Sequence, residues 1–322
     1  MLENLPKTFV GVSRFFADPL VCIDFVAMMR WPDGESVCFH CKQKGAYFMP
    51  SRKIYRCKNK ECKKQFSIKM GTIFEESAIG LDKWLIAMWQ LANCKNGISS
   101  YELGRAIGVT QRTAWFMLHR IRTAMTNGSL EKMTGTVEID EAYIGGAAKN
   151  MHQSKRERFQ PRWTRQKVRD HKTAVFGMVQ RGGKVRAKVV KNSHGNTLKT
   201  MDVMPIINGN IEANSEVFSD QAIIYRDLYE KYVHATVNHS VEYVRGNVHT
   251  NGIENFWSLL KRSIKGTYIS VSPAHLQKYV EEQMFRFNER KGNDQMRFMS
   301  MLELISGKRL TYSQLIGYET GR

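Results

Sequence analysis

The first third of the chain alternates amphipathic segments with runs of turn-forming residues. Apolar residues recur at helical spacing over residues 13–30, and the turn sequence of residues 31–34 ends that predicted helix. Two short strands are predicted at residues 46–49 and 53–56. Three further helices are predicted at residues 82–94, from Ser99 or Ser100 to Ile107, and after the capping residue Thr110.

After Gly128 the pattern becomes that of a sheet with interspersed helices. Residues 136–144 alternate, with Val137 and Ile139 on one side and Glu138 and Asp140 on the other. The elements predicted next are a hairpin at 174–179 and 185–190, a helix at 198–207, a strand at 216–220, a helix at 221–232, a strand at 235–237, helices at 249–262 and 273–290, and a short helix with a loop at 296–322.

Four of the six cysteines form two closely spaced pairs. Cys38 and Cys41 are separated by two residues, Cys57 and Cys62 by four, and 15 residues lie between the pairs. Two short loops at this separation can direct four thiolates at one ion, which is typical of a tetrahedral structural zinc site. His40 is an alternative ligand in the first loop, although four cysteines already complete the shell. We therefore predict a zinc ribbon whose ion has no open position for water.

Together these elements predict a multidomain α+β fold. It combines an N-terminal zinc ribbon and a helical helix-turn-helix with an α/β ribonuclease-H-like mixed sheet flanked by helices. The predicted boundaries are 1–35 for an N-terminal helical segment, 36–72 for the ribbon, 80–128 for the helix-turn-helix, 132–292 for the sheet domain with a basic insertion at 147–172, and 293–322 for a C-terminal tail.

The net charge of +19 is the unusual bulk property, since the contents of 42% hydrophobic and 25% charged residues are ordinary. Such an excess of positive charge favours a polyanionic partner. No apolar run reaches the length of a membrane span, and Asp18 and Asp24 interrupt the N-terminal apolar residues, so no signal peptide is predicted. We therefore expect nucleic acid as the partner in a cytoplasmic location.

Two groups of residues are candidates for DNA contact. A turn at residues 108–110 between two helices is typical of a DNA-binding helix-turn-helix, although an ordinary helical hairpin shares this pattern. Residues 149–172 carry nine Lys or Arg against two acidic residues, which favours phosphate binding over a merely solvated loop. The candidates are Gln111, Arg112, Thr113, His119 and Arg120 in the third helix, and Arg162, Arg165 and Lys167 in the basic run.

Three carboxylates fall at related places in the predicted sheet domain. Asp140 would lie on the central strand, Asp220 at the end of the fourth strand, and Glu254 on the helix packed beside them. Convergence there could hold two divalent cations about 3.5–4 Å apart, the arrangement used in phosphodiester chemistry. Each residue also has a simpler interpretation, as a polar strand residue, a helix cap or a surface charge. Lys261, seven residues after Glu254, lies on the same helix face.

In the order of these elements and in the residues within them, the chain resembles the ISXO-like group of bacterial insertion-sequence DDE transposases over nearly its whole length. The residues that carry the resemblance are 30–34, 65–67, 71–74, Ala114-Trp115, 137–141 with Gly145-Gly146, Ser219-Asp220, 249–262, 266–268 and 285–288. Two features depart from the family pattern: Phe39 replaces a common proline, and the second cysteine pair has four intervening residues rather than two.

The resemblance implies a metal-dependent transposase that cuts at terminal inverted repeats and joins 3′-hydroxyl ends to target DNA. It implies that Asp140, Asp220 and Glu254 bind two Mg²⁺ or Mn²⁺ ions, that Lys261 contacts DNA near the cut, and that one Zn²⁺ is structural. Family members vary at the third acid, so Asn251 is an alternative to Glu254. The expected partner is double-stranded DNA, bound by a homodimer or higher oligomer associated with the bacterial nucleoid.

Two other functions fit the same residues. The first is an inactive, domesticated DNA-binding regulator, and the second is a nuclease of the same fold that cuts without joining. Inverted repeats flanking the coding region would favour the transposase.

Overall fold

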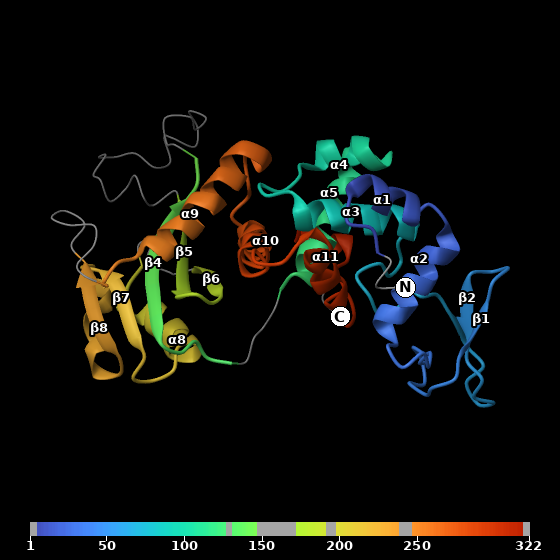
Figure 1. The fold of residues 1–322 in the computed structure, drawn as a ribbon, viewed down its shortest axis with the longest axis horizontal. Helices are drawn as coiled ribbons and strands as arrows, with labels where there is room; N and C mark the ends of the chain where they lie inside the picture. The colour runs from blue at the N-terminus through green and yellow to red at the C-terminus, as the bar shows by residue number, and fades with distance from the viewer. Residues whose placement is uncertain (1–4, 127–130, 147–171, 191–197, 238–246, 318–322) are drawn as a thin grey trace. The chain divides into compact units, whose positions relative to one another are not determined.

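The computed structural model describes residues 5–126, 131–146, 172–190, 198–237 and 247–317 (Figure 1). The chain forms two compact units. The first, which we call the ribbon–helix unit, comprises Met1–Asn127 and Glu289–Arg322, and the second, the sheet unit, comprises Gly128–Asn288. In the described ranges, no helix is long and apolar enough to cross a membrane.

The N-terminal helical segment is two helices rather than the one predicted over residues 13–30. Helix α1 spans Phe9–Phe15 and helix α2 spans Pro19–Arg30. The Asp18 side chain accepts a hydrogen bond from the Leu20 amide, and Pro19 occupies the first helical position of α2. Proline has no amide hydrogen and fits a first helical turn but not a helix interior, so the chain starts a new helix there.

The predicted helix-turn-helix is confirmed, and its capping residues explain its boundaries. The three helices are α3 (Leu81–Asn93), α4 (Ser100–Ile107) and α5 (Gln111–Ala124). Ser99 and Glu102 form a capping box at the start of α4, and Thr110 caps α5. Gly108 ends α4 with a φ of +63°, a left-handed conformation that glycine adopts without a steric penalty.

The C-terminal tail forms two helices and belongs to the core of the ribbon–helix unit. Helix α11 spans Asp294–Glu303 and helix α12 spans Tyr312–Ile316. Phe298 of α11 is fully buried, and its ring lies within 6.2 Å of the rings of Phe16, Phe25 and Trp89. The tail therefore returns to the N-terminal helices and closes their apolar core.

The sheet unit contains the predicted mixed sheet, with β4 (Thr136–Ile144) in the centre of the order β6-β5-β4-β7-β8 (Figure 1). Strand β4 is antiparallel to β5 and parallel to β7. The other strands are β5 (Thr173–Gln180), β6 (Val185–Val190), β7 (Glu216–Asp220) and β8 (Val233–Val237). This topology, with the first strand central, confirms the predicted fold class.

Helices cover both faces of the sheet, following the alternation along β4. Val137 and Ile139 pack toward helix α8 (Thr200–Asn210) and the 3-10 helix η3 (Ile223–Glu230), where an α-helix over 221–232 was predicted. Ala142 and Ile144 pack toward α9 and α10. Helix α9 spans Asn251–Ser263, continues into the π-helix η4 (Ile264–Tyr268), and is followed by α10 (Leu276–Asn288).

Helix α9 approaches the sheet closely because a glycine lies beneath it. Gly177 of β5 is opposite Asp140 in the strand register. A Cβ atom at Gly177 would come within 2.6 Å of the Trp257 ring and 2.8 Å of the Ile253 side chain. Since real contacts of this length do not occur, only glycine allows this packing.

We predict that Gly177→Ala destabilises the sheet unit by about 1–3 kcal/mol, because an added methyl group forces α9 away from a packed core. Chemical denaturation of the full chain would measure this loss. Gly209→Ala is the matched control, since a Cβ there meets nothing within 4 Å and α8 would keep or gain stability. Equal stability of the two variants would contradict the packing argument.

Candidate functional site

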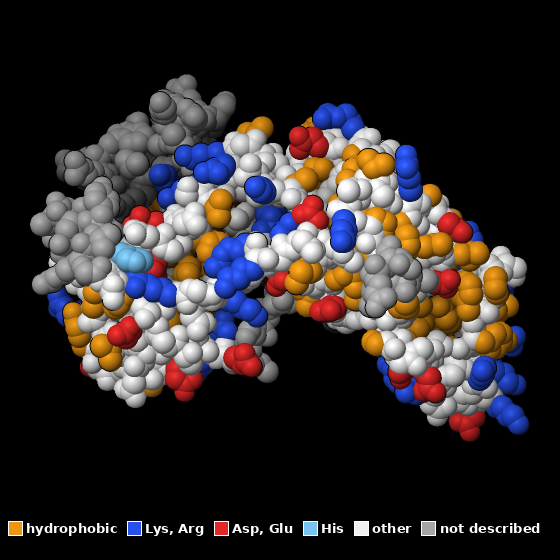
Figure 2. Space-filling model, in the orientation of Figure 1, with side chains coloured by type: hydrophobic (Ala, Val, Ile, Leu, Met, Phe, Trp, Pro, Cys, Tyr) orange, Lys and Arg blue, Asp and Glu red, His pale blue; other side chains and the backbone are white. Residues whose placement is uncertain are grey.

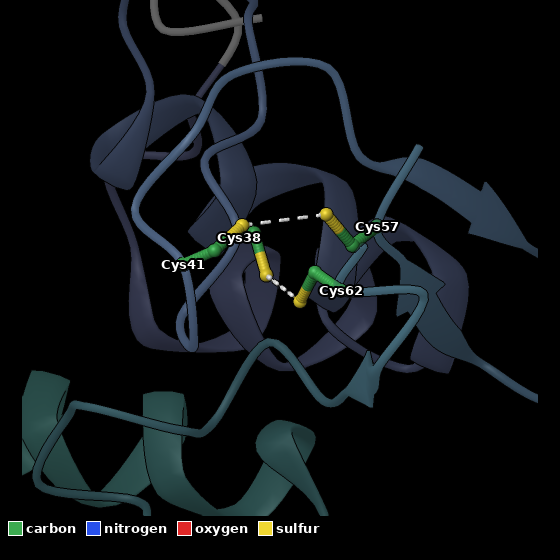
Figure 3. A group of neighbouring side chains, drawn as sticks. All are labelled: Cys38, Cys41, Cys57 and Cys62. Atoms are coloured by element: carbon green, nitrogen blue, oxygen red, sulfur yellow. Dashed lines mark hydrogen bonds between the residues drawn. The ribbon is translucent and has the colours of Figure 1, made fainter. Parts of the chain in front are cut away.

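The four predicted cysteines converge at one point of the zinc ribbon (Figure 3). Strands β1 (Tyr47–Met49), β2 (Ile54–Arg56) and β3 (Gln65–Phe66) form its three-stranded sheet. The Sγ atoms of Cys38 and Cys62 are 3.9 Å apart, and those of Cys41 and Cys57 are 3.5 Å apart. Tetrahedral zinc with sulfur ligands at about 2.3 Å requires a spacing of about 3.8 Å. The cluster therefore fits a structural zinc ion.

The two loops of the ribbon have the backbone geometry that directs paired thiols inward. The Lys42 amide donates to the Cys38 carbonyl, and the Lys63 amide donates to the carbonyl of Asn59. Lys42 and Lys63 both have positive φ angles, so each loop turns back tightly. A backbone hydrogen bond from Gln43 lowers the pKa of the Cys41 thiol to about 7, whereas burial raises the pKa of Cys57 to about 12. A buried thiol of this kind ionises readily only beside a cation.

The start of α5 presents three of the predicted DNA-contacting residues. Gln111 and Arg112 are exposed, and Thr113 is half-buried. The Gln111 side-chain amide donates to the Ser100 hydroxyl at 2.8 Å, and Arg112 donates to the Tyr312 hydroxyl of α12. These contacts hold the first turn of α5 against its neighbours.

The prediction for Arg120 is corrected by its burial. Its side chain is 3% exposed, and its guanidinium donates to the backbone carbonyls of Leu310 and Glu75. Arg120 therefore supplies hydrogen-bond donors to backbone carbonyl groups in the segments around α5. A side chain engaged in this way inside the unit does not face a DNA groove. The prediction for His119 is wrong for a related reason, since its side chain is fully buried.

The predicted contacts at Arg162, Arg165 and Lys167 lie outside the described residues. Elsewhere, Figure 2 shows Lys and Arg side chains on the visible face of both units, interspersed with acidic ones. On this face, the basic side chains therefore do not form one continuous positive patch.

Asp140 and Asp220 lie on adjacent parallel strands and face the same side of the sheet. In the register of β4 and β7, Glu138 is opposite Phe218, and each aspartate lies two residues further along its strand. Asp220 also accepts a hydrogen bond from the Ala222 amide at 3.1 Å, but it is not the helix cap of the simpler interpretation, because the N-cap residue of η3 is Ala222. One oxygen of Asp220 thus stabilises the turn, and the carboxylate remains beside Asp140.

Asp140 occupies an environment that disfavours its negative charge. Burial, followed by the charges of Glu141 and Asp220, raises its pKa to about 7. The Trp257 indole N–H donates to Asp140 Oδ2 at 3.0 Å. A carboxyl group that is buried near two other acids is stabilised in its ionised form by a nearby cation. Glu141 faces the opposite side, where Tyr225 donates to it at 2.6 Å.

Helix α9 has the predicted buried stripe, formed by Ile253, Phe256, Trp257 and Leu260. Glu254 and Lys261 are both exposed, as expected for residues on another face, and so is Asn251. The Thr250 hydroxyl donates to Glu254 Oε1 at 3.1 Å. Because Glu254 precedes Trp257 by three residues, the two side chains are neighbours on the helix surface. The contact from Trp257 to Asp140 therefore brings this part of α9 toward the aspartates.

The acidic residues offer oxygen ligands suited to Mg²⁺ or Mn²⁺, which prefer carboxylates. Within the described segments, the cysteine cluster is the one group of three or more potential ligands whose atoms all lie within 4.8 Å of one another. The carboxylates of Asp140, Asp220 and Glu254 therefore do not lie as close together as the ligands of one shared ion.

Sequence reasoning did not assign a role to Glu138 or Arg181. Glu138 is only 2% exposed and accepts a hydrogen bond from Arg181 Nε at 2.9 Å. The sequence contains one signal for Glu138. It is an acidic residue within a strand of Val and Ile, on the same side as Asp140, and an acidic side chain in such a place needs a partner. Trp257 was likewise predicted only as a core residue.

The two units combine a tetrathiolate zinc ribbon, a helix-turn-helix and a mixed sheet with paired carboxylates on its central strands. This combination defines a zinc-ribbon protein of the ribonuclease-H-like fold class. Residues 132–288 match the family model described as the ISXO2-like transposase domain, and residues 20–65 match the transposase zinc-ribbon domain. The chain belongs to the ISXO2-like family of insertion-sequence transposases.

Comparison with individual proteins gives a curated relative and, among solved structures, a weak match. A Halobacterium salinarum protein described as an uncharacterized protein in transposable element ISH50 is 27% identical over 266 residues, covering 80% of this chain and 84% of that protein. A chain of the cryo-EM structure of the simian T-cell lymphotropic virus intasome in complex with PP2A regulatory subunit B56 gamma has 13% identity and a TM-score of 0.27. That match covers 60% of this chain and 66% of the other, and it is too weak to support an argument.

Proposed function

We propose that this protein is the active transposase of its element. It binds the terminal inverted repeats, cleaves DNA at the element ends, and transfers the 3′-hydroxyl ends to target DNA. The observation that supports this proposal is the pairing of Asp140 with Asp220 on adjacent parallel strands, beside the helix that carries Glu254. Membership of the transposase family supports the same chemistry.

In this proposal, Asp140, Asp220 and Glu254 bind two Mg²⁺ ions, for which Mn²⁺ can substitute. The ions, when bound, activate a nucleophilic oxygen and stabilise the leaving oxygen of the phosphodiester. Trp257 orients Asp140 by donating to Oδ2. Lys261 contacts a phosphate near the cut, since it lies almost two turns beyond Glu254 on the exposed face. No serine or tyrosine nucleophile is required.

DNA recognition is assigned to the ribbon–helix unit. Gln111, Arg112 and Thr113 lie at the start of α5, where a recognition helix contacts base edges. Arg162, Arg165 and Lys167 would add contacts to the DNA backbone from the basic insertion. A homodimer or higher oligomer would hold the two element ends together.

The test is a cleavage and joining assay with the full chain, duplex DNA from the flanks of the coding region, and a supercoiled target. We expect new 3′-hydroxyl ends and joined products in Mg²⁺ or Mn²⁺, and neither in EDTA. Cleavage without joining would instead identify a nuclease. Binding without cleavage would identify a regulator, and either result would overturn the proposal.

The choice between Glu254 and Asn251 gives a separate prediction. Glu254→Gln is expected to lower the cleavage rate by more than about 100-fold, because even residues behind a metal ligand contribute 10–100-fold. Asn251→Ala is expected to keep the rate within a few-fold. The same assay in Mg²⁺ measures both, and the reverse order of effects would assign the third ligand to Asn251.

A further inference from the structure

Glu138 is a buried carboxylate that is not one of the three proposed metal ligands. It lies on β4 two residues before Asp140, on the side of the sheet that faces α9. Its two oxygens are both occupied by donors. Oε1 accepts from Arg181 Nε at 2.9 Å and lies 3.4 Å from His249 Nδ1, and Oε2 accepts from two backbone amides of α9.

These amides belong to the first turn of α9, which Glu138 caps from outside the helix. The amides of Gly252 and Ile253 donate to Glu138 Oε2 at 2.6 Å and 3.1 Å. Thr250, at the N-cap position, makes no side-chain capping bond and instead donates to Glu254. A negative charge at a helix N-terminus is favourable because the unpaired amides and the helix dipole meet it there. The strand thus performs the capping, and the local threonine holds Glu254.

Arg181 completes the arrangement by neutralising Glu138 and holding the segment before α9. Its guanidinium donates to the carbonyl oxygens of Asn247 at 2.7 Å and His249 at 3.0 Å, and stacks 4.8 Å from the Phe218 ring centre. Buried charges are tolerated when they are paired and hydrogen-bonded in this way.

Gly252 shows how tightly this contact is built. A Cβ atom at this position would come within 2.7 Å of Glu138 Oε2 and 3.2 Å of its Cδ. The close approach of the helix backbone to the carboxylate therefore requires a glycine. It also leaves no space for a water molecule between them.

We propose that Glu138, together with Arg181 and Thr250, is a positioning residue that fixes Glu254 relative to Asp140. This inference rests on the proposed function, since it concerns the placement of the third metal ligand. Glu138 joins the strand that carries the first acid to the first turn of the helix that carries the third. Glu254 follows Ile253 directly, so a shift of the capped turn displaces its carboxylate. Displacements near 1 Å are enough to cost a catalytic site about 100-fold.

The first test is Glu138→Gln in the full chain, with Glu212→Gln as the control at an exposed position. Glutamine has one acceptor oxygen, and its amide group would face donors from Arg181 or the backbone. In the variant we expect hydrogen exchange of the Gly252 and Ile253 amides to accelerate at least about 10-fold. We also expect the affinity for Mn²⁺, measured by electron paramagnetic resonance, and the cleavage rate to fall about 10–100-fold, with unchanged affinity for DNA ends.

The second test is Thr250→Val, which keeps the cap from Glu138 and removes the hydroxyl that holds Glu254. Amide exchange at residues 252 and 253 should then stay unchanged, while Mn²⁺ affinity falls. This variant remains informative if Glu138→Gln does not fold.

Each alternative result has a distinct meaning. Unchanged amide exchange in Glu138→Gln would overturn the capping contact. Faster exchange with normal Mn²⁺ affinity and cleavage would overturn the positioning role. A wild-type chain that neither binds Mn²⁺ nor cleaves DNA would instead overturn the proposed function. In that case the exchange measurement would test only the capping contact between Glu138 and α9.

Discussion

Replacing Asp140 with asparagine is expected to abolish DNA cleavage and joining while stabilising the protein at neutral pH when Mg²⁺ and Mn²⁺ are absent. The activity loss should be about 10⁴-fold, as for a residue that acts as one part of a catalytic set. Asparagine keeps the size of the side chain and can still accept from the Trp257 indole, so the packing of α9 is retained. DNA-end binding should therefore be unchanged.

The stability gain follows from the direction of the Asp140 pKa. Burial and neighbouring acids raise this pKa from 3.8 to about 7. Between these pH values the unfolded chain has lost the proton while the folded chain retains it, so stability falls as pH rises through this interval. Each pH unit is worth about 1.4 kcal/mol, which gives a cost of up to about 4 kcal/mol above pH 7.

Denaturation of wild type and Asp140→Asn at pH 5 and pH 8, with the zinc retained and Mg²⁺ and Mn²⁺ absent, would measure this cost. The gain for the variant should be small at pH 5 and largest at pH 8. Asp227→Asn, an exposed aspartate of η3, controls for the same chemical change. A variant with wild-type activity, or one that loses stability as pH rises just as the wild type does, would contradict the assignment.

Replacing Cys57 with serine is expected to remove zinc and unfold the ribbon. Three thiolates and a hydroxyl bind zinc far more weakly than four thiolates, and zinc binding supplies about 10–16 kcal/mol of folding free energy in small zinc domains. The ribbon has few other sources of stability, because its strands are two or three residues long. The sheet unit has its own core and should remain folded.

Elemental analysis and limited proteolysis would test this expectation. We expect one zinc per chain in wild type, almost none in Cys57→Ser, and new cleavage sites between residues 36 and 66. Cys94→Ser is the matched control, since Cys94 lies outside the cluster. Retention of one zinc per Cys57→Ser chain would exclude Cys57 as a ligand.

Much of the architecture was predictable because it depends on local patterns. The alternation along residues 136–144 predicts both the strand and its two faces, and the structure confirms this at Val137 and Asp140. The caps at Ser99 and Thr110 begin helices because their side chains satisfy amides three residues away. The cysteine spacing predicts the metal cluster for the same reason, since each pair lies within one short loop.

The errors arose where local patterns compete or where contacts are distant. A single helix over residues 13–30 was expected from the apolar spacing alone. Pro19 overrides that spacing, because proline fits the first turn of a helix but not its interior, so a new helix begins there. Arg120 is a residue type that commonly contacts DNA, yet its side chain is buried. Its guanidinium donates to the backbone carbonyl of Leu310, which lies 190 residues further along the chain. The tail joins the first unit through Phe298, which its short apolar pattern does not specify.

By itself, the sequence determined the elements, the metal-binding cysteines and the family, because periodicity, caps and spacing act over a few residues. Only the tertiary structure decided which carboxylate caps α9 and which residues hold the others in place. Glu138 and Asp140 are both acids on the same side of one strand, and no local pattern distinguishes them. They differ in what the fold brings opposite each: Arg181 and the first turn of α9 for Glu138, Trp257 and Asp220 for Asp140. That difference in surroundings separates a clamped, charge-paired carboxylate from one suited to a metal ion.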